Sequence, residues 1–191
     1  MPKPLTPEII RQAAQGDHHA FRVLVDTHQA FAYAVAFRFM GHAGDAEDIV
    51  QEAFVRLWKN LHQYRPAVKL TTWLYRIIAN LCLDLLKSRP ERQRRSAVSI
   101  EASYDVTTQN TPEGYLQQQE LMDAIRAAAD ELTPLQRAVF VLRDLEGLPV
   151  EEVSDILSMP AGNVKSNLYY ARRKVGERLK TLYRTDKWSM L

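Results

Sequence analysis

Amides, hydroxyls and cations share one side of the stretch GNVKSNLYYARRKVGERLK, residues 162–180. At about 100° per residue, a helix here gathers its apolar side chains in a stripe roughly 80° wide. That stripe consists of Val164, Leu168, Ala171, Val175 and Leu179. The remaining surface carries Asn163, Lys165, Ser166, Asn167, Tyr169, Tyr170, Arg172, Arg173, Lys174 and Arg178. Such side chains bind base edges and phosphates, so the pattern predicts a helix that packs by one face and binds nucleic acid by the other.

The residues just before this stretch predict a helix-turn-helix. A short helix over 150–157 and a turn over 158–160 precede the long helix. In this arrangement the second helix enters the major groove, and its first residues read base edges. The side chains suited to that task are Asn163 and Asn167 for adenine, Lys165 for guanine, and Tyr169 or Tyr170 for a thymine methyl or a phosphate. The alternative is an ordinary helical hairpin with a solvated basic face.

A second polar stripe recurs at helical spacing in LTTWLYRIIANLCLDLLKSR, residues 70–89. It consists of Thr72, Arg76, Asn80, Asp84 and Lys87, and Trp73 belongs to the apolar side. A stripe of this kind, ending in a basic run over 87–95, suits melted DNA, with nearby loop residues gripping an unstacked base. The pattern taken alone favours a solvated amphipathic face over this interpretation.

Carboxylates cluster at the start of DAEDIVQEAFVRLWKNL, residues 45–61. They are Asp45, Glu47, Asp48 and Glu52, and the helix dipole is a sufficient structural reason for acids in a first turn. They spread along one helix with no histidine paired to them, so we expect no metal site. An acidic face repels DNA and attracts basic proteins, which makes a partner-docking surface the better functional interpretation.

Signs of catalysis are lacking in the sequence. The histidines at 18, 19, 28, 42 and 62 have no metal-ligand spacing, and there is no phosphate-binding loop, nucleophile elbow or Cys/His dyad. The single cysteine, Cys82, rules out an internal disulfide framework and is expected to be a small buried hydrophobe. We therefore expect no catalytic residues, no cofactor and no small-molecule substrate.

The elements that must position these groups are helices throughout. Patterns with a 3.6-residue period recur, whereas alternating β-branched runs are nearly absent, and the chain has only 7 Gly and 9 Pro. The sequence predicts an all-α fold. Its expected helices span about 7–15, 18–40, 46–63, 70–89, 113–131, 134–146, 150–157 and 161–183. Asp17, Asp45 and Thr133 are their expected caps, the last in a capping box with Gln136.

The chain is expected to divide into two small helical domains. Residues 96–112 are rich in Ser, Thr and Asn, carry no helical period and end at Pro112, which is typical of a flexible polar linker. Fully extended, this linker spans up to about 60 Å. The predicted domains are 1–95 and 113–191. A packed irregular segment that holds them in fixed register is the alternative.

The overall charge and hydropathy restrict where the protein can bind and reside. A net charge of +2 is too small for the whole molecule to act as a polyanion binder, so nucleic-acid affinity must come from local patches. The first residues lack a signal peptide's apolar region, and no stretch of about 18 apolar residues occurs. We expect a cytoplasmic protein without direct membrane insertion.

Three motifs in order identify a family resemblance. They are GDAEDIVQEAFVRLWKNL, TTWLYRIIANLCLDLLKSR and LTPLQRAVFVLRDLEGLPVEEVSDILSMPAGNVKSNLYYARRKVGERL, with the polar linker between the second and the third. Together they strongly resemble the extracytoplasmic-function (ECF) sigma factors of bacteria, over nearly all of residues 10–182. The resemblance implies a subunit that binds core RNA polymerase and directs it to promoter DNA, and it implies no enzymatic activity.

Roles for individual residues follow from the resemblance. Residues 1–95 correspond to the family's region two, and residues 113–191 correspond to its region four, with a helix-turn-helix. The implied −10 contacts are Thr72, Trp73, Arg76, Asn80 and Lys87, beside the loop that runs from Tyr64 to Thr72. The implied polymerase contacts are Asp45, Asp48, Gln51, Glu52 and Leu57. The implied −35 contacts are Gly162, Asn163, Lys165, Ser166, Asn167, Tyr169, Tyr170, Arg172 and Arg173.

The resemblance also implies regulation. Family members are commonly silenced by an anti-sigma factor, so we expect such a partner, a stress regulon and, where that partner is membrane-bound, retention at the inner membrane. Two rival functions remain to be distinguished. A stand-alone dimeric helix-turn-helix regulator would bind duplex DNA tightly without polymerase. An enzyme on a helical scaffold would show a small-molecule-dependent activity that single substitutions abolish.

Overall fold

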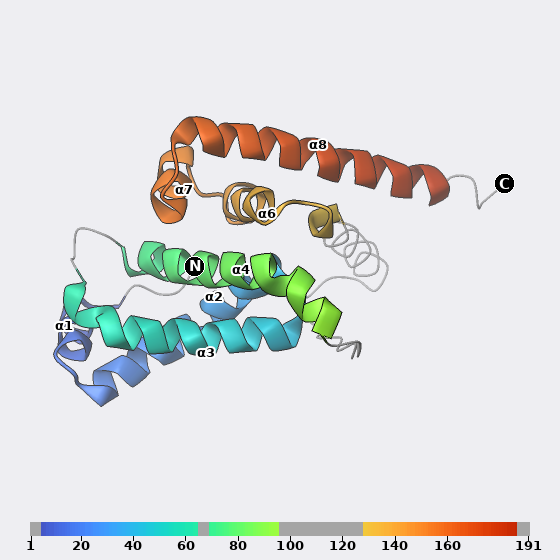
Figure 1. Cartoon of the computed structure of the whole chain (residues 1–191). Coiled ribbons are helices and arrows are strands. Elements are labelled where there is room, and N and C mark those ends of the chain that lie inside the picture. Colours follow the sequence, from blue (N-terminus) through green and yellow to red (C-terminus); the bar gives the residue numbers. More distant parts are fainter. Residues whose placement is uncertain (1–4, 65–68, 96–127, 187–191) are drawn as a thin grey trace. The chain divides into compact units, whose positions relative to one another are not determined.

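The structure is a computed structural model that describes residues 5–64, 69–95 and 128–186. No strand occurs within these ranges, which confirms the all-α prediction for the described part of the chain. The described residues fall into two compact units, which we treat separately. The first contains helices α1 to α4; the second contains α6, a π-helical turn, the start of α7 and α8 (Figure 1).

The first unit is a bundle of long helices. Its elements are α1 (Pro7–Ala14), α2 (His18–Met40), α3 (Ala43–Asn60), the 3-10 turn η1 (Leu61–Gln63) and α4 (Leu70–Arg95). Helices α2, α3 and α4 pack against one another, and α1 packs on α2. Their shared core includes Leu24, Phe39, Leu57, Leu74 and Ile78, all with under 1% of their surface exposed. Cys82 is buried in this unit, as predicted.

Capping side chains fix where α2 and α3 begin. Asp17 caps α2 by accepting the Ala20 N–H at 2.9 Å, and Gly41 ends it in a left-handed conformation with φ 69°. The predicted cap Asp45 was wrong, because α3 begins earlier and Nδ1 of His42 accepts the Asp45 N–H instead. The turn between α2 and α3 is therefore two residues long, which holds these helices side by side.

The described part of the second unit consists of the end of one helix, helices α6 and α8, a π-helical turn and the start of α7. Residues 128–130 are helical, and the next elements are α6 (Pro134–Phe140), the π-helical turn η2 (Val141–Leu145), α7 (Val150–Leu157) and α8 (Ala161–Asp186). Thr133 and Gln136 form the predicted capping box at the start of α6. The expected helix over 134–146 is thus one helical run that widens into a π turn.

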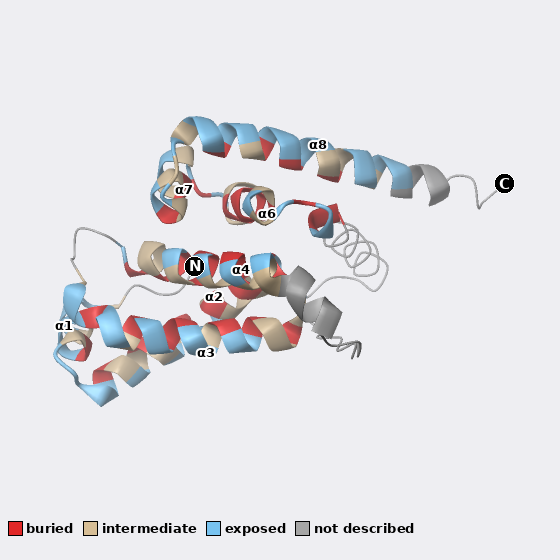
Figure 2. Cartoon of the chain, viewed as in Figure 1, coloured by how far each residue is buried: buried red, intermediate tan, exposed pale blue. Residues whose placement is uncertain are grey.

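The core of the second unit lies between α6 and α8. It contains Ala128, Ala129, Leu132, Phe140, Ala171 and Val175, with Leu145 and Leu179 packed against it. Figure 2 shows the buried residues of α8 along one side of the helix and exposed residues along the other. The amphipathic pattern predicted for this helix is confirmed. The predicted linker, 96–112, and most of the expected helix 113–131 lie outside the described residues.

Candidate nucleic-acid interface

The start of α8 presents the polar surface expected of a reading helix. Val164 and Leu168 are buried, which turns the intervening residues outward. Those exposed along this surface are Gly162, Asn163, Lys165, Ser166, Tyr169, Tyr170, Arg172 and Arg173. Asn167 is half-buried, and its amide donates to the Asn163 carbonyl at 2.8 Å. Eight of the nine side chains or backbones predicted for −35 contact are therefore accessible on one helix.

Two tyrosines form the most exposed large hydrophobic group among the α8 side chains that the structure describes. Tyr169 is 64% exposed and Tyr170 46% exposed. Their rings meet edge to face with centroids 5.5 Å apart, and the Arg173 guanidinium lies 5.7 Å from the Tyr170 ring centre. Contacts of this kind restrict side-chain motion before any ligand binds. The group suits a thymine methyl or a sugar–phosphate edge.

Several cations of α8 contact their own unit. Arg172 donates two hydrogen bonds to the Asp144 carboxylate, at 2.8 and 2.6 Å, and these bonds raise the pKa of its guanidinium further. Lys174 donates to the Glu131 carbonyl at 3.0 Å, and Arg178 lies 3.6 Å from the Glu131 carboxylate. Lys165, by contrast, has no carboxylate partner among the described residues. The basic edges seen in the sequence are thus largely committed to the fold.

The outer face of α3 is acidic with one apolar residue in it. Asp48, Gln51 and Glu52 are exposed, Asp45 is half-buried, and Val55, one further turn along, is 45% exposed. Val55 was not predicted, although its spacing from Asp48 and Gln51 places it on the same face. Leu57, predicted as a docking residue, is completely buried. That assignment is corrected, because Leu57 lies on the core side of α3 and cannot reach a partner.

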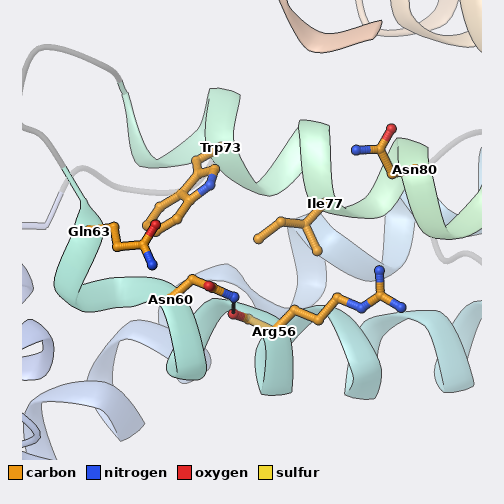
Figure 3. Close-up of a pocket in the computed structure, with 6 residues that line it drawn as sticks. All are labelled: Arg56, Asn60, Gln63, Trp73, Ile77 and Asn80. Carbon is orange, nitrogen blue, oxygen red and sulfur yellow. Dashed lines mark hydrogen bonds between the residues drawn. The ribbon is translucent and has the colours of Figure 1, made fainter. Parts of the chain in front are cut away.

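A surface pocket of about 230 Å³ lies between α3 and α4. Arg56, Asn60 and Gln63 line it from one side, and Trp73, Ile77 and Asn80 line it from the other. Figure 3 shows the Trp73 ring and the Asn60 and Gln63 amides directed toward the same space. The pocket is smaller than a typical drug-sized site and suits one flat polar group.

The pocket joins an aromatic stack to several amides. The Trp73 ring stacks on Tyr64 with centroids 5.7 Å apart and an interplanar angle of 20°, and partial burial raises the pKa of the Tyr64 phenol. Asn60 donates to the Arg56 carbonyl at 2.8 Å, which leaves its amide oxygen available. Asn80 is exposed, and its amide has no hydrogen-bond partner among the described residues. The Asn80 amide and the Asn60 amide oxygen, which remain available beside the ring, can bind a base edge while the ring contacts its face.

The structure brings together only some of the residues predicted for the −10 contact. Trp73 and Asn80 line the pocket. Thr72 is half-buried, Arg76 and Lys87 are exposed elsewhere on α4, and residues 65–68 of the predicted loop lie outside the described residues. Arg56, Asn60, Gln63 and Ile77 were not predicted. Their spacing was a usable signal, since 56, 60 and 63, on α3 and η1, and 73, 77 and 80, on α4, are separated by the same intervals.

The described residues contain neither a cluster suited to a metal ion nor a helix suited to cross a membrane. No group of three or more His, Cys, Asp or Glu side chains is placed to hold a metal ion within them. Nor does any helix described here have the length and hydropathy that crossing a membrane requires.

Known proteins resemble this chain along nearly its whole length. The family pattern "Sigma-70 region 2" matches residues 24–92, and "Sigma-70, region 4" matches residues 122–175. The ECF RNA polymerase sigma factor SigW of Bacillus subtilis is 31% identical over 179 residues, which cover 91% of this chain and 96% of SigW. The ECF RNA polymerase sigma-E factor of Escherichia coli is 29% identical over 191 residues, which cover 96% of this chain and 100% of that factor.

Solved structures resemble it as well. CnrH, solved in complex with the cytosolic domain of CnrY, has a TM-score of 0.62 and 25% identity, covering 91% of this chain and 96% of CnrH. The sigma factor RpoE of Bartonella quintana, solved with the anti-sigma factor NepR, has a TM-score of 0.63 and 24% identity, covering 84% of this chain and 96% of RpoE. The second likeness concerns the fold alone.

Proposed function

The chain belongs to the ECF sigma factors of RNA polymerase, and from that membership we propose which of its surfaces bind promoter DNA and which binds polymerase. As a sigma factor it is not an enzyme; it directs core polymerase to promoters. We assign the −10 element to the first unit, the −35 element to α8, and polymerase docking to the outer face of α3.

The observation that carries the −10 assignment is the pocket between α3 and α4. An enzyme or factor that reads a base outside the duplex needs a hollow of about one base, an aromatic surface and hydrogen-bonding groups. The pocket supplies the hollow, Trp73 with Tyr64 supplies the surface, and Asn60, Gln63 and Asn80 supply the groups. We propose that one non-template base of the opened −10 element enters it.

The −35 assignment rests on the exposed start of α8. Asn163, Lys165 and Ser166 face away from the core on the first turns of a helix that follows a tight turn after α7. Residues in this position of a helix-turn-helix contact base edges in the major groove. Tyr169, Tyr170 and Arg173 follow along the same surface and are assigned to the flanking backbone.

The polymerase assignment rests on charge and exposure. Asp48, Gln51, Glu52 and Val55 form an exposed surface in which the carboxylates lie on the N-terminal side of one apolar side chain. A docking surface commonly has an apolar centre with a polar rim, and its charge selects a basic partner. We assign this surface, without Leu57, to core polymerase.

An inhibitor and a location complete the proposal. We propose that an anti-sigma factor binds the chain and blocks its polymerase-docking surface, as a family partner would. The chain then acts in the cytoplasm on a stress regulon, and a membrane-bound inhibitor would hold it at the inner membrane until the stress signal arrives.

Run-off transcription tests the proposal. Purified core polymerase would be incubated with and without this protein on fragments of the source genome. We expect discrete transcripts that appear only when the protein is present, with start sites downstream of shared −35 and −10 sequences. Absence of transcripts and of binding to core polymerase, together with tight duplex binding by the protein alone, would instead support a stand-alone regulator.

A further inference from the structure

Two neighbouring charged residues occupy the π-helical turn after α6. Over Val141–Leu145 the backbone widens, so that the Glu146 N–H donates to the Val141 carbonyl at 2.9 Å and the Leu148 N–H donates to the Leu142 carbonyl at 3.0 Å. A π turn is uncommon and often marks a functional position. Here the widened turn contains Arg143 and Asp144 and changes the directions in which their side chains point.

These two side chains bind in different places. The Arg143 guanidinium donates to the Leu148 carbonyl, in the segment that leads into α7. The Asp144 carboxylate accepts both hydrogen bonds from Arg172, which lies 28 residues later on α8. The π turn therefore contacts both the entry to the first helix and the middle of the second helix of the helix-turn-helix.

We propose that the Asp144–Arg172 pair is a positioning device that sets the placement of α8 for −35 reading, and that Arg172 acts through this pair and not through a phosphate. The proposal rests on the proposed function of α8. It changes the role that the sequence resemblance implied for Arg172, and it assigns a role to Asp144, which the sequence analysis did not single out.

The geometry favours positioning over a loose surface contact. Two parallel N–H···O bonds from one guanidinium fix both its direction and its distance, unlike a single contact. The Asp144 side chain is only 20% exposed, so it is held in position by its neighbours. Arg172 could reach a distant phosphate only by breaking its two hydrogen bonds to Asp144. Arg172 comes three residues after Tyr169 and three before the buried Val175, between the reading surface and the core.

Two other cations of α8 also contact their own unit, whereas Arg173 lies 3.7 Å from Glu177 on the same helix. Lys174 and Arg178 both contact Glu131, which lies next to the core of the same unit. Lys165 and Lys180 have no hydrogen-bond or ion-pair partner among the described residues. The pair thus belongs to a set of inward contacts that hold the helix, while Lys165 is available to DNA.

The salt dependence of promoter binding separates the two roles. Each phosphate contact contributes about 0.9 to the slope of log affinity against log salt concentration. We would measure that slope, and the preference among −35 sequences, for holoenzyme carrying Arg172→Gln, Asp144→Asn, the double variant, or Arg173→Gln as the control, because Arg173 is the cation assigned to the flanking backbone. Arg173→Gln is expected to lower the slope by about one.

The two pair variants should leave the slope unchanged. Each should weaken binding to the preferred −35 sequence by a similar factor, about fivefold, and the double variant should be no worse than either. Arg172→Lys keeps the charge but loses the fork, so it should broaden the −35 preference as Arg172→Gln does. A lower slope for Arg172→Gln with no effect of Asp144→Asn would overturn the proposal.

Thermal unfolding completes the test. If the pair variants lower the unfolding temperature of the protein but leave the −35 preference of the holoenzyme unchanged, the pair is structural only and the positioning role is overturned. If wild-type holoenzyme itself shows no −35 dependence, the proposed function of α8 fails, which is a different result from failure of the pair.

Discussion

Asn80 combines exposure with an unpaired amide at the edge of the α3–α4 pocket. We expect Asn80→Ala to relax the preference for one base of the −10 element by about 1–3 kcal/mol, the usual contribution of a good base-edge contact. The measurement is run-off transcription on promoters that carry each of the four bases at every −10 position.

Asp84→Ala is the matched control, because Asp84 is exposed one turn further along α4 and does not line the pocket. The assignment of Asn80 fails if both variants shift the base preference equally, or if Asn80→Ala lowers transcription from all promoters by the same factor.

His28 makes the stability of the first unit depend on pH. It is 3% exposed, its Nδ1 lies 2.9 Å from the Leu24 carbonyl, and burial lowers the pKa of its imidazole below the ordinary 6.5. The unfolded chain then binds more protons than the folded one below about pH 6.5. We expect the free energy of unfolding by urea to fall between pH 7 and pH 5.

A substitution isolates this effect. His28→Gln should flatten the dependence between pH 7 and pH 5, since glutamine does not titrate, whereas His19→Gln at an exposed position should leave it intact. An equally steep dependence in the His28→Gln protein would show that another group is responsible.

For single residues, the sequence predicted the kinds of side chain at the site better than their positions in the structure. Trp73 and Asn80 were singled out by the family resemblance, and Asn80 also by its place in a polar stripe at helical spacing. Arg56, Asn60 and Gln63 recur at helical spacing as well, but that spacing alone does not show that they face Trp73 and Asn80, since this depends on α3 and α4 lying side by side. Leu57 was misassigned because a position within a family motif does not tell which face of the helix is buried.

Helix α6 depends on its N-terminal cap. The Thr133 hydroxyl accepts the Gln136 N–H at 3.3 Å, and the Gln136 side-chain oxygen accepts the Thr133 N–H at 3.2 Å. Thr133→Ala should cost about 1 kcal/mol of stability. Thermal unfolding followed by circular dichroism should show a midpoint lower by several degrees, about 4–8 °C for a domain of this size.

Thr181→Ala supplies the comparison for the cap. Its hydroxyl bonds back to the Glu177 carbonyl on the exposed surface of α8, so its removal should change stability by less than about 0.5 kcal/mol. Equal effects of the two substitutions would mean that the loss at Thr133 is not a capping effect.

Helix boundaries were predictable where strong caps mark them. Asp17 and Gly41 bracket α2, which spans the predicted 18–40, and the capping box predicted the start of α6. The cap of α3 was predicted wrongly at Asp45. Histidine is a less usual cap than aspartate, so His42, the actual cap, was overlooked. The π turn escaped prediction, since one extra residue per turn does not disturb a hydrophobic pattern only five residues long.

For the whole molecule we expect polymerase binding and promoter preference to be separable. Asp48→Arg reverses a charge at the exposed acidic face of α3 and should weaken binding to core polymerase while leaving the −35 preference alone. Fluorescence anisotropy of labelled protein titrated with core polymerase measures the first property. Asp26→Arg, an exposed carboxylate on α2, is the matched charge reversal and should bind core normally.

The reverse experiment uses the other unit. Asn163→Ala should change which −35 sequences are used, by about 1–3 kcal/mol at the base concerned, with core binding unaffected. Loss of core binding in Asn163→Ala, or normal core binding in Asp48→Arg, would each show that its surface has been wrongly assigned.

The inward-turned cations of α8 also affect how long the chain remains on DNA that is not a promoter. Sliding along a duplex depends on sequence-independent attraction to phosphates. Arg172, Lys174 and Arg178 contact their own unit, which leaves fewer cations of α8 free to attract such DNA, so we expect each nonspecific encounter to end sooner. We therefore expect scanning of the genome to depend more on the contacts that polymerase itself makes with the duplex.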